Sequence, residues 1–209
     1  LLSQWQCACE MCQQSRVEGE LMATVKQRTR VGDECYVLVA GVGNVLRGDD
    51  GFGIAVVQQL AQRPDLPSTV KVVEVGIGGI SLVQELLDGY DVLLIVDAVD
   101  RGGPPGTIYL LEPEVPDLSQ WPFEQRQDFL ADMHMTTPAR ALILAKALGV
   151  FPPRVYMLGC QPTSCDDLVI GLSAPVQDAV APGVERLIGE LLRLTSISHG
   201  VKEIDRIGE

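Results

Sequence analysis

The chain has 209 residues, of which 46% are hydrophobic and 21% are charged, a composition that can build one folded core and is unlike that of a disordered chain. Its formal net charge of −12 argues against the clustered basic surface that nucleic acid or an anionic membrane requires, so neither is expected as a partner. No apolar run reaches the ~18 residues of a membrane span and the first residues do not read as a signal peptide, so we expect a cytoplasmic protein with free thiols.

The sequence predicts a single folded domain between two tails. Residues 1–34 lack the apolar pattern of core elements and are expected to be a disordered or leader-derived tail. The cysteines of the "CACEMC" stretch in this tail are Cys7, Cys9 and Cys12. Without a fourth ligand they make an incomplete structural zinc site. We expect one α/β domain over 35–195 and a charged C-terminal tail over 196–209.

Strands and helices alternate from the start of this domain. The apolar stretch "CYVLVAGV" (35–42) predicts a strand, and 51–63 predicts a helix with its apolar residues near one face. A second strand is predicted over 70–76. The glycine-rich "GIGGISL" that follows is expected to form a flexible loop, leading into a helix over 80–89.

The third strand, predicted over 91–100, is a nearly continuous apolar run, as in strands covered on both faces. A fourth strand is predicted over 107–112. The prolines of 113–127 favour a loop there. The clearest helix signal covers 136–149, which has a threonine N-cap, a proline in the first turn and a closing glycine.

A last strand over 154–160 precedes a helix over 173–194, which Pro182 and Gly183 should break or kink. The alternation predicts an α/β three-layer sandwich with a mostly parallel central sheet flanked by helices. In such sheets the working residues gather beyond the carboxyl ends of the strands. The candidates at that end are Asp49, Asp50, Gly76 to Gly79, Asp97, His134, Cys160 and Gln161.

The turn after the first strand, "GVGNVLRGDDGFG" (41–53), resembles a nucleotide-binding turn but fails both phosphate-binding patterns. Leu46 stands where a dinucleotide fingerprint needs its third glycine, and two aspartates stand where a Walker loop needs lysine. Carboxylates weaken phosphate binding but ligate metals. The turn therefore favours a cation site. Asp49 is expected to cap the following helix, whereas Asp50 is expected to serve the site.

A metal site needs partners for Asp50, and the chain offers few. Asp97 ends an apolar strand, where a carboxylate is costly unless paired or metal-bound. The other histidine, His199, lies in the charged tail, which leaves His134. An O,O,N set of Asp50, Asp97 and His134 would suit Zn, Ni, Mn or Fe. Considered one at a time, each residue is better explained without a metal: Asp97 as an aspartate bonded to amides at a strand end, and His134 as a surface histidine.

The ordered motifs "GVGNVLRGDDGFG", "GIGGISLVQEL", "VDAVD" and "PPGTIYLLE", with a histidine just before a helix, resemble the hydrogenase maturation endopeptidases. The resemblance covers roughly residues 36 to 194; residues 1 to about 30 have no counterpart in the family's pattern. It implies an α/β fold with a sheet between helices. It also implies Asp50, Asp97 and His134 as metal ligands.

The family removes a C-terminal peptide from the large-subunit precursor of nickel-iron hydrogenases after nickel insertion. The resemblance therefore implies that precursor as partner and its nickel as the metal, with other divalent metals left open. In one account the three ligands recognise the precursor's nickel; in another the acids polarise the attacking water, as in an aspartyl protease. A nickel carrier or assembly chaperone, and a nucleotide- or nucleoside-binding α/β enzyme, stay open as alternatives. The sequence does not decide the oligomeric state.

Overall fold

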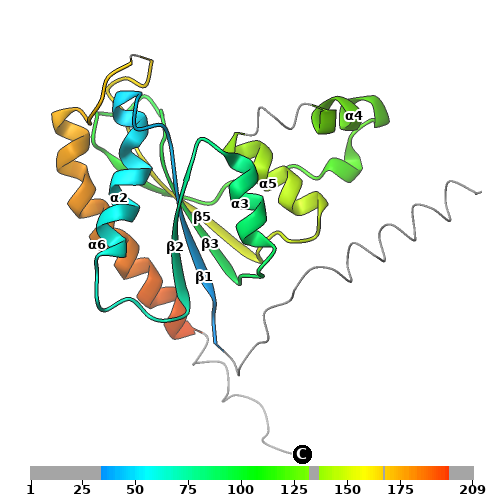
Figure 1. Cartoon of the computed structure of the whole chain (residues 1–209), viewed down its shortest axis with the longest axis horizontal. Coiled ribbons are helices and arrows are strands. Elements are labelled where there is room, and N and C mark those ends of the chain that lie inside the picture. Colours follow the sequence, from blue (N-terminus) through cyan, green and yellow to red (C-terminus); the bar gives the residue numbers. More distant parts are fainter. Residues whose placement is uncertain (1–33, 132–136, 167, 198–209) are drawn as a thin grey trace, which may run out of the picture.

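The computed structural model describes residues 34–131, 137–166 and 168–197 (Figure 1). These residues form a five-stranded sheet in the order β2-β1-β3-β5-β4, in which β4 is antiparallel to β5 and the other neighbours are parallel. The strands are β1 (Val37–Val42), β2 (Val70–Gly76), β3 (Val92–Ala98), β4 (Ile108–Leu111) and β5 (Arg154–Cys160). The mostly parallel sheet predicted from the sequence is confirmed.

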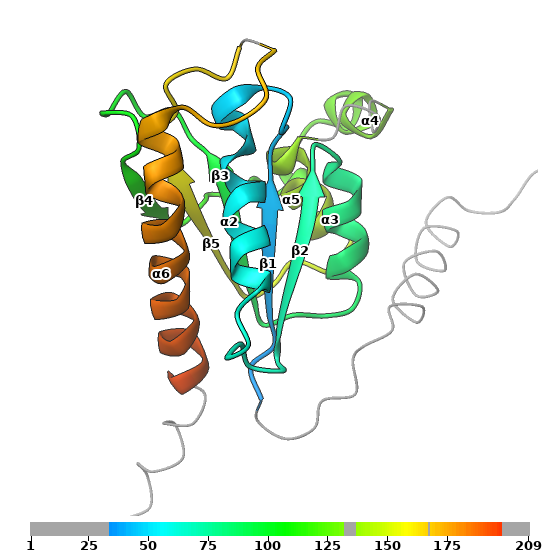
Figure 2. The ribbon, with the colours of Figure 1, turned by 60° about the vertical axis from the view of Figure 1, so that its left-hand side comes forward.

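Helices cover both faces of this sheet. Figure 2 shows α2 and α6 on one face and α3 and α5 on the other. The helices are η1 (Gly48–Gly51), α2 (Phe52–Ala61), α3 (Gly79–Leu86), η2 (Leu118–Gln120), α4 (Phe123–Ala131), α5 (Pro138–Ala147) and α6 (Ala174–Ile197). Within the described part of the chain, none of them is both long and apolar enough to cross a bilayer.

Each face of the sheet has its own apolar core. Every residue of β1 is buried, because the strand lies inside the sheet and helices cover it on both sides. Its alternate side chains divide between the two cores: Val37 and Val39 pack with α2 and α6, and Leu38 and Ala40 pack with α3 and α5. The predicted three-layer sandwich is confirmed.

The proline-rich segment 113–127, predicted as a loop, contains η2 and the start of α4. That prediction was wrong because Pro116 and Pro122 lie just before η2 and α4, where proline does not disturb a helix. Pro122 precedes Phe123, the first residue of α4, and its carbonyl accepts a hydrogen bond from Arg126 N at 3.1 Å. Proline is well tolerated at a helix start, since its missing N–H would have no helical partner there.

The last helix is not broken. α6 runs as a single helix from Ala174 to Ile197 with Pro182 inside it, contrary to the predicted break. Pro182 is exposed, while the next residue, Gly183, is buried against the side chains of Phe52 and Val56. The long apolar face of α6 is buried in the core shared with α2. This burial outweighs the one backbone hydrogen bond that a proline removes.

The glycine-rich loop after β2 is shorter than predicted. Gly76 adopts a positive φ of 62° at the end of β2, and α3 already begins at Gly79. Only positions 77 and 78 connect the strand to the helix, and Ile77 is exposed. The expected flexible loop is therefore a tight connection at the carboxyl end of the sheet.

Candidate active site

Glycines allow the start of α2 to pack directly on the sheet. A Cβ atom at Gly53 would collide with the carbonyl oxygens of Val42 in β1 and Val96 in β3. A Cβ atom at Gly41 would collide with the side chain of Val57 in α2. The glycine pattern of the turn thus serves close packing of helix on sheet. It brings η1, which carries the two aspartates, over the ends of β1 and β3.

Asp50 is held by the turn itself. Its Oδ2 accepts a hydrogen bond from Asn44 N at 2.9 Å, and its side chain is half-buried. Gly43, with φ of 126°, makes this fold-back possible, because a Cβ there would collide with the carbonyl oxygen of Asp50. The turn therefore holds the carboxylate of Asp50 at the carboxyl end of β1.

Asp97 lies next to the end of β3, opposite Gly159 of the neighbouring β5. Among the residues that the structure describes, its one hydrogen bond comes from Ala98 N to Oδ1 at 2.8 Å. Burial raises the pKa of Asp97 to about 7; the Ala98 amide opposes this effect and the charge of Asp50 adds to it. Near neutral pH the carboxyl group is therefore present in both protonated and ionised forms.

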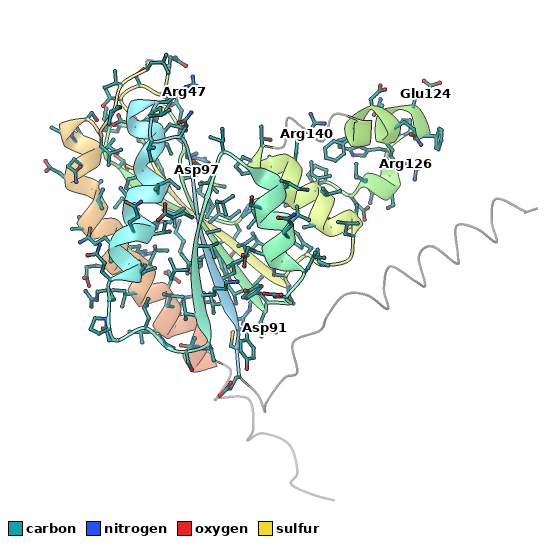
Figure 3. The ribbon with its side chains drawn as sticks, in the orientation of Figure 1. Arg47, Asp91, Asp97, Glu124, Arg126 and Arg140 are labelled. Carbon is teal, nitrogen blue, oxygen red and sulfur yellow. The ribbon has the colours of Figure 1, made fainter. Side chains whose placement is uncertain are left out.

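Asp50 and Asp97 lie at the same end of the sheet. The charge of Asp50 acts on Asp97, and η1 contacts β3. Figure 3 shows Asp97 at the same end of the sheet as Arg47 of the β1 turn, with Asp91 at the opposite end of β3. Arg47, the one basic residue of the turn, is exposed and lies 3.6 Å from Asp166.

The third predicted ligand, His134, lies outside the described residues, as do His199, Cys7, Cys9 and Cys12. Within the described residues alone, no three His, Cys, Asp or Glu side chains are grouped as metal ligands. The two carboxylates fit part of a divalent-metal site, because hard and borderline cations accept carboxylate oxygen. They would be two of its protein ligands, and the O,O,N set stays a prediction.

Asp49 does not cap α2, contrary to the sequence-based expectation. Neither η1 nor α2 has a side-chain cap. Asp49 is only 2% exposed and turns toward the connection between β5 and α6. Its Oδ1 accepts from Ser173 N at 2.6 Å, and its Oδ2 accepts from Thr163 N at 2.7 Å and Ser173 Oγ at 2.8 Å. Burial raises the pKa of Asp49, but these hydrogen bonds together hold it below its usual value.

Sequence reasoning did not find these partners of Asp49, which lie 114 and 124 positions along the chain. It also gave no role to Cys165, which lies near the acidic residues. Burial, with the charges of Asp50, Asp49 and Asp97, raises the pKa of Cys165 to about 11. Its thiol is therefore protonated at neutral pH and is a weak nucleophile. Cys35, Cys160 and Cys165 are free, and the expectation of free thiols holds for them.

Comparisons with known proteins identify the family of the chain. A family model described as hydrogenase maturation protease matches residues 54–190. The chain is 34% identical to the hydrogenase expression/formation protein HupD of Thiocapsa roseopersicina, over 78% of this chain and 71% of that protein. It is 35% identical to the hydrogenase expression/formation protein HoxM of Cupriavidus necator, over 72% of this chain and 73% of that protein.

Solved structures of hydrogenase maturation peptidases are similar to this chain in fold and sequence. The hydrogenase maturating endopeptidase HybD from E. coli is 31% identical, with a TM-score of 0.60 over 76% of this chain and 93% of that one. A hydrogenase 2 maturation peptidase from a Thaumarchaeota archaeon is 32% identical, with a TM-score of 0.54 over 75% of this chain and 97% of that one. Because the family model matches most of the chain and these relatives are about a third identical to it where they match, the chain belongs to the hydrogenase maturation protease family.

Proposed function

We propose that this protein is an endopeptidase that removes the C-terminal extension of a nickel-iron hydrogenase large-subunit precursor after nickel has been inserted. The observation that carries the proposal is the convergence of Asp50 and Asp97 at one end of the sheet, in a chain of this protease family. The related proteins are named hydrogenase maturation or hydrogenase formation proteins, which supports a hydrogenase precursor as the substrate.

In this proposal Asp50, Asp97 and His134 are the residues that meet the nickel of the precursor. The β1 turn fixes Asp50 through Asn44 N, and β3 fixes Asp97 through its place beside β5. Two carboxylates with an imidazole make a ligand set that a borderline divalent ion accepts. Cleavage would then follow nickel insertion, because the three side chains need nickel in the precursor to dock on.

One observation also favours acid–base chemistry by the same pair. The pKa of Asp97, raised to about 7 by burial, lets this carboxyl group accept or release a proton near neutral pH. The neighbouring Asp50 is the second carboxylate of the pair. An aspartyl-type reaction, in which the pair polarises the attacking water, would not require nickel in the precursor. The two accounts therefore differ in one measurable property.

That property is the nickel dependence of cleavage. Purified precursor, with and without nickel, is incubated with the protein, and loss of the C-terminal peptide is followed by mass spectrometry. Under the nickel account only the loaded precursor is cleaved, although the scissile sequence is the same in both. Equal cleavage of the two would reject the nickel account and favour the aspartyl-type reaction.

Variants test the residues. Asp50→Asn, Asp97→Asn and His134→Gln should each lose most cleavage, because an amide is a poor metal ligand and a poor base. Asp65→Asn is the matched control, since Asp65 lies past the C-terminal end of α2 in an exposed pair with Arg63. If the wild-type protein binds nickel but cleaves neither precursor, the carrier function replaces the protease function.

A further inference from the structure

Asp49 is one of the few buried charged residues among those described, yet the proposed reaction does not use it. It follows Gly48 and precedes Asp50, so any movement of its backbone also moves Asp50. Its hydrogen bonds of 2.6 to 2.8 Å reach Thr163 and Ser173. These residues lie near the two ends of the β5–α6 connection, of which the structure describes residues 161–166 and 168–173. One carboxylate thus ties together both ends of this connection.

The middle of the β5–α6 connection is also bound to the acidic turn. Gly48 N donates to Val169 O at 2.7 Å, and Arg47 forms an isolated parallel bridge with Val169. Figure 2 shows the connection rising beyond the carboxyl end of the sheet, near the start of α2. The turn that carries Asp50 and the β5–α6 connection are therefore one hydrogen-bonded unit with Asp49 at its centre.

This connection exposes apolar surface beside the turn that carries Asp50. We use the name aliphatic tip for Leu168, Val169 and Ile170, which are 87%, 52% and 84% exposed. A cavity of about 240 Å³ lies between the turn and the connection, lined by Val169, Ile170 and Leu172 together with Asp49 and neighbouring polar residues. Its size and lining suit an apolar side chain of a bound polypeptide.

We propose that Asp49 is a positioning residue that fixes the β5–α6 connection, so that the aliphatic tip and its cavity bind an apolar segment of the precursor beside Asp50 and Asp97. This inference rests on the proposed function. The partner is the precursor polypeptide, because Val169 of the tip accepts a hydrogen bond from Gly48, two residues before Asp50, so that a polypeptide bound at Asp50 lies next to the tip. A carboxylate is needed at position 49, because three donors converge on its two oxygens.

The test begins with Asp49→Asn, whose amide group turns donors toward the N–H groups that Asp49 now accepts from. We expect KM for the nickel-loaded precursor to rise about tenfold or more, as for loss of one charge-assisted hydrogen bond, while kcat changes much less. Ile170→Ser should also raise KM. Combined with Asp49→Asn, it should add little, because the tip is already displaced. Asp65→Asn serves as the control without effect.

A second measurement does not depend on cleavage. Hydrogen exchange of Asp49→Asn should show faster exchange at the amides of Thr163 and Ser173, with β1 and β3 as protected as in the wild type. Precursor binding is compared between Asp97→Asn and the double variant Asp97→Asn/Asp49→Asn, neither of which cleaves and both of which lack the same carboxylate. The added Asp49→Asn should weaken binding by the same factor by which it raises KM. These readouts separate positioning from loss of the fold.

Several results would overturn the inference. Unchanged KM in Asp49→Asn, strictly additive effects of Asp49→Asn and Ile170→Ser, or unchanged exchange at Thr163 and Ser173 would each do so. If the wild-type protein cleaves no precursor, the proposed function fails on its own. The binding and exchange measurements then still decide whether Asp49 positions the connection.

Discussion

At the scale of single residues, Asp49 and Asp50 are neighbours whose carboxylates lie in different surroundings. Asp49 is buried and accepts hydrogen bonds from Thr163 and Ser173, whereas Asp50 is half-buried and accepts one from Asn44. The two aspartates of the turn therefore have different roles. Asp49 holds the β5–α6 connection by hydrogen bonds, and the charge of Asp50 acts on Asp97. Asp49 caps neither η1 nor α2, so the effect of Asp49→Asn is expected through its hydrogen bonds to Thr163 and Ser173 instead.

Replacing Asp97 with Asn should stabilise the metal-free fold more at pH 8.5 than at pH 5.5. Burial raises the pKa of Asp97 to about 7 in the folded protein, above the ~3.9 of an unfolded aspartate. Its contribution to stability is therefore complete below about pH 4 and is lost as pH rises through 7. An asparagine cannot ionise and avoids this loss.

The stabilisation at pH 8.5 should be on the order of 1–2 kcal/mol. This is less than the whole shift from ~3.9 to about 7 would give at ~1.4 kcal/mol for each pKa unit, because solvent reaches the half-buried carboxylate. Urea unfolding in EDTA at both pH values measures it. For Asp65→Asn, the difference in unfolding free energy from the wild type should be the same at pH 5.5 and pH 8.5. The reason is that Arg63 lowers the pKa of Asp65, so this group titrates below pH 5.5. A pH-independent difference for Asp97→Asn would contradict the buried-carboxylate account.

At the scale of elements, α6 shows tertiary packing overriding a local helix breaker. Its buried residues, including Val180, Val184 and Leu187, join the core that α2 shares with the sheet. Pro182 faces solvent, and Gly183 allows the helix to approach Phe52. The proline thus lies on the side of the helix where it does not disturb the core.

Pro182→Ala should raise the free energy of unfolding by about 1–2 kcal/mol. An interior proline costs a helix ~3 kcal/mol relative to alanine, and part of this gain is offset by the greater freedom of alanine in the unfolded chain. Urea unfolding followed by circular dichroism measures the change. Pro175→Ala, in the first turn of the same helix, is the matched control and should change stability by less. Equal or lower stability of Pro182→Ala would show that the helix depends on its proline.

At the scale of the whole molecule, acidic residues outnumber basic ones by 28 to 16, for a net charge of −12. Like charges repel more strongly in the compact state than in the unfolded chain. Most of the ion pairs of the described residues have exposed partners, such as Arg63 with Glu185, and exposed pairs contribute little to stability. Screening of the overall repulsion should therefore dominate the response of the fold to salt.

We expect the melting temperature at pH 7.5 to rise between 0.01 M and 0.15 M NaCl, as the Debye length shortens from about 30 Å to about 8 Å. The same titration near the isoelectric point of about 4.5 is the control, and there the salt effect should vanish. Differential scanning calorimetry measures both. A melting temperature that falls with salt at pH 7.5 would mean that attractive ion pairs outweigh the net repulsion.

The sequence by itself determined the α/β alternation, the sites of the five strands and the placement of Asp50 and Asp97 at one end of the sheet. These features follow from local rules, because apolar periodicity marks each element and parallel strands end at the same edge. Only the tertiary structure decided that Asp49 binds Thr163 and Ser173, that α6 continues through Pro182 and that α4 forms after Pro122. The first two depend on contacts between segments far apart in the chain, which no local pattern records, and the third on a proline falling at a helix start instead of inside a loop.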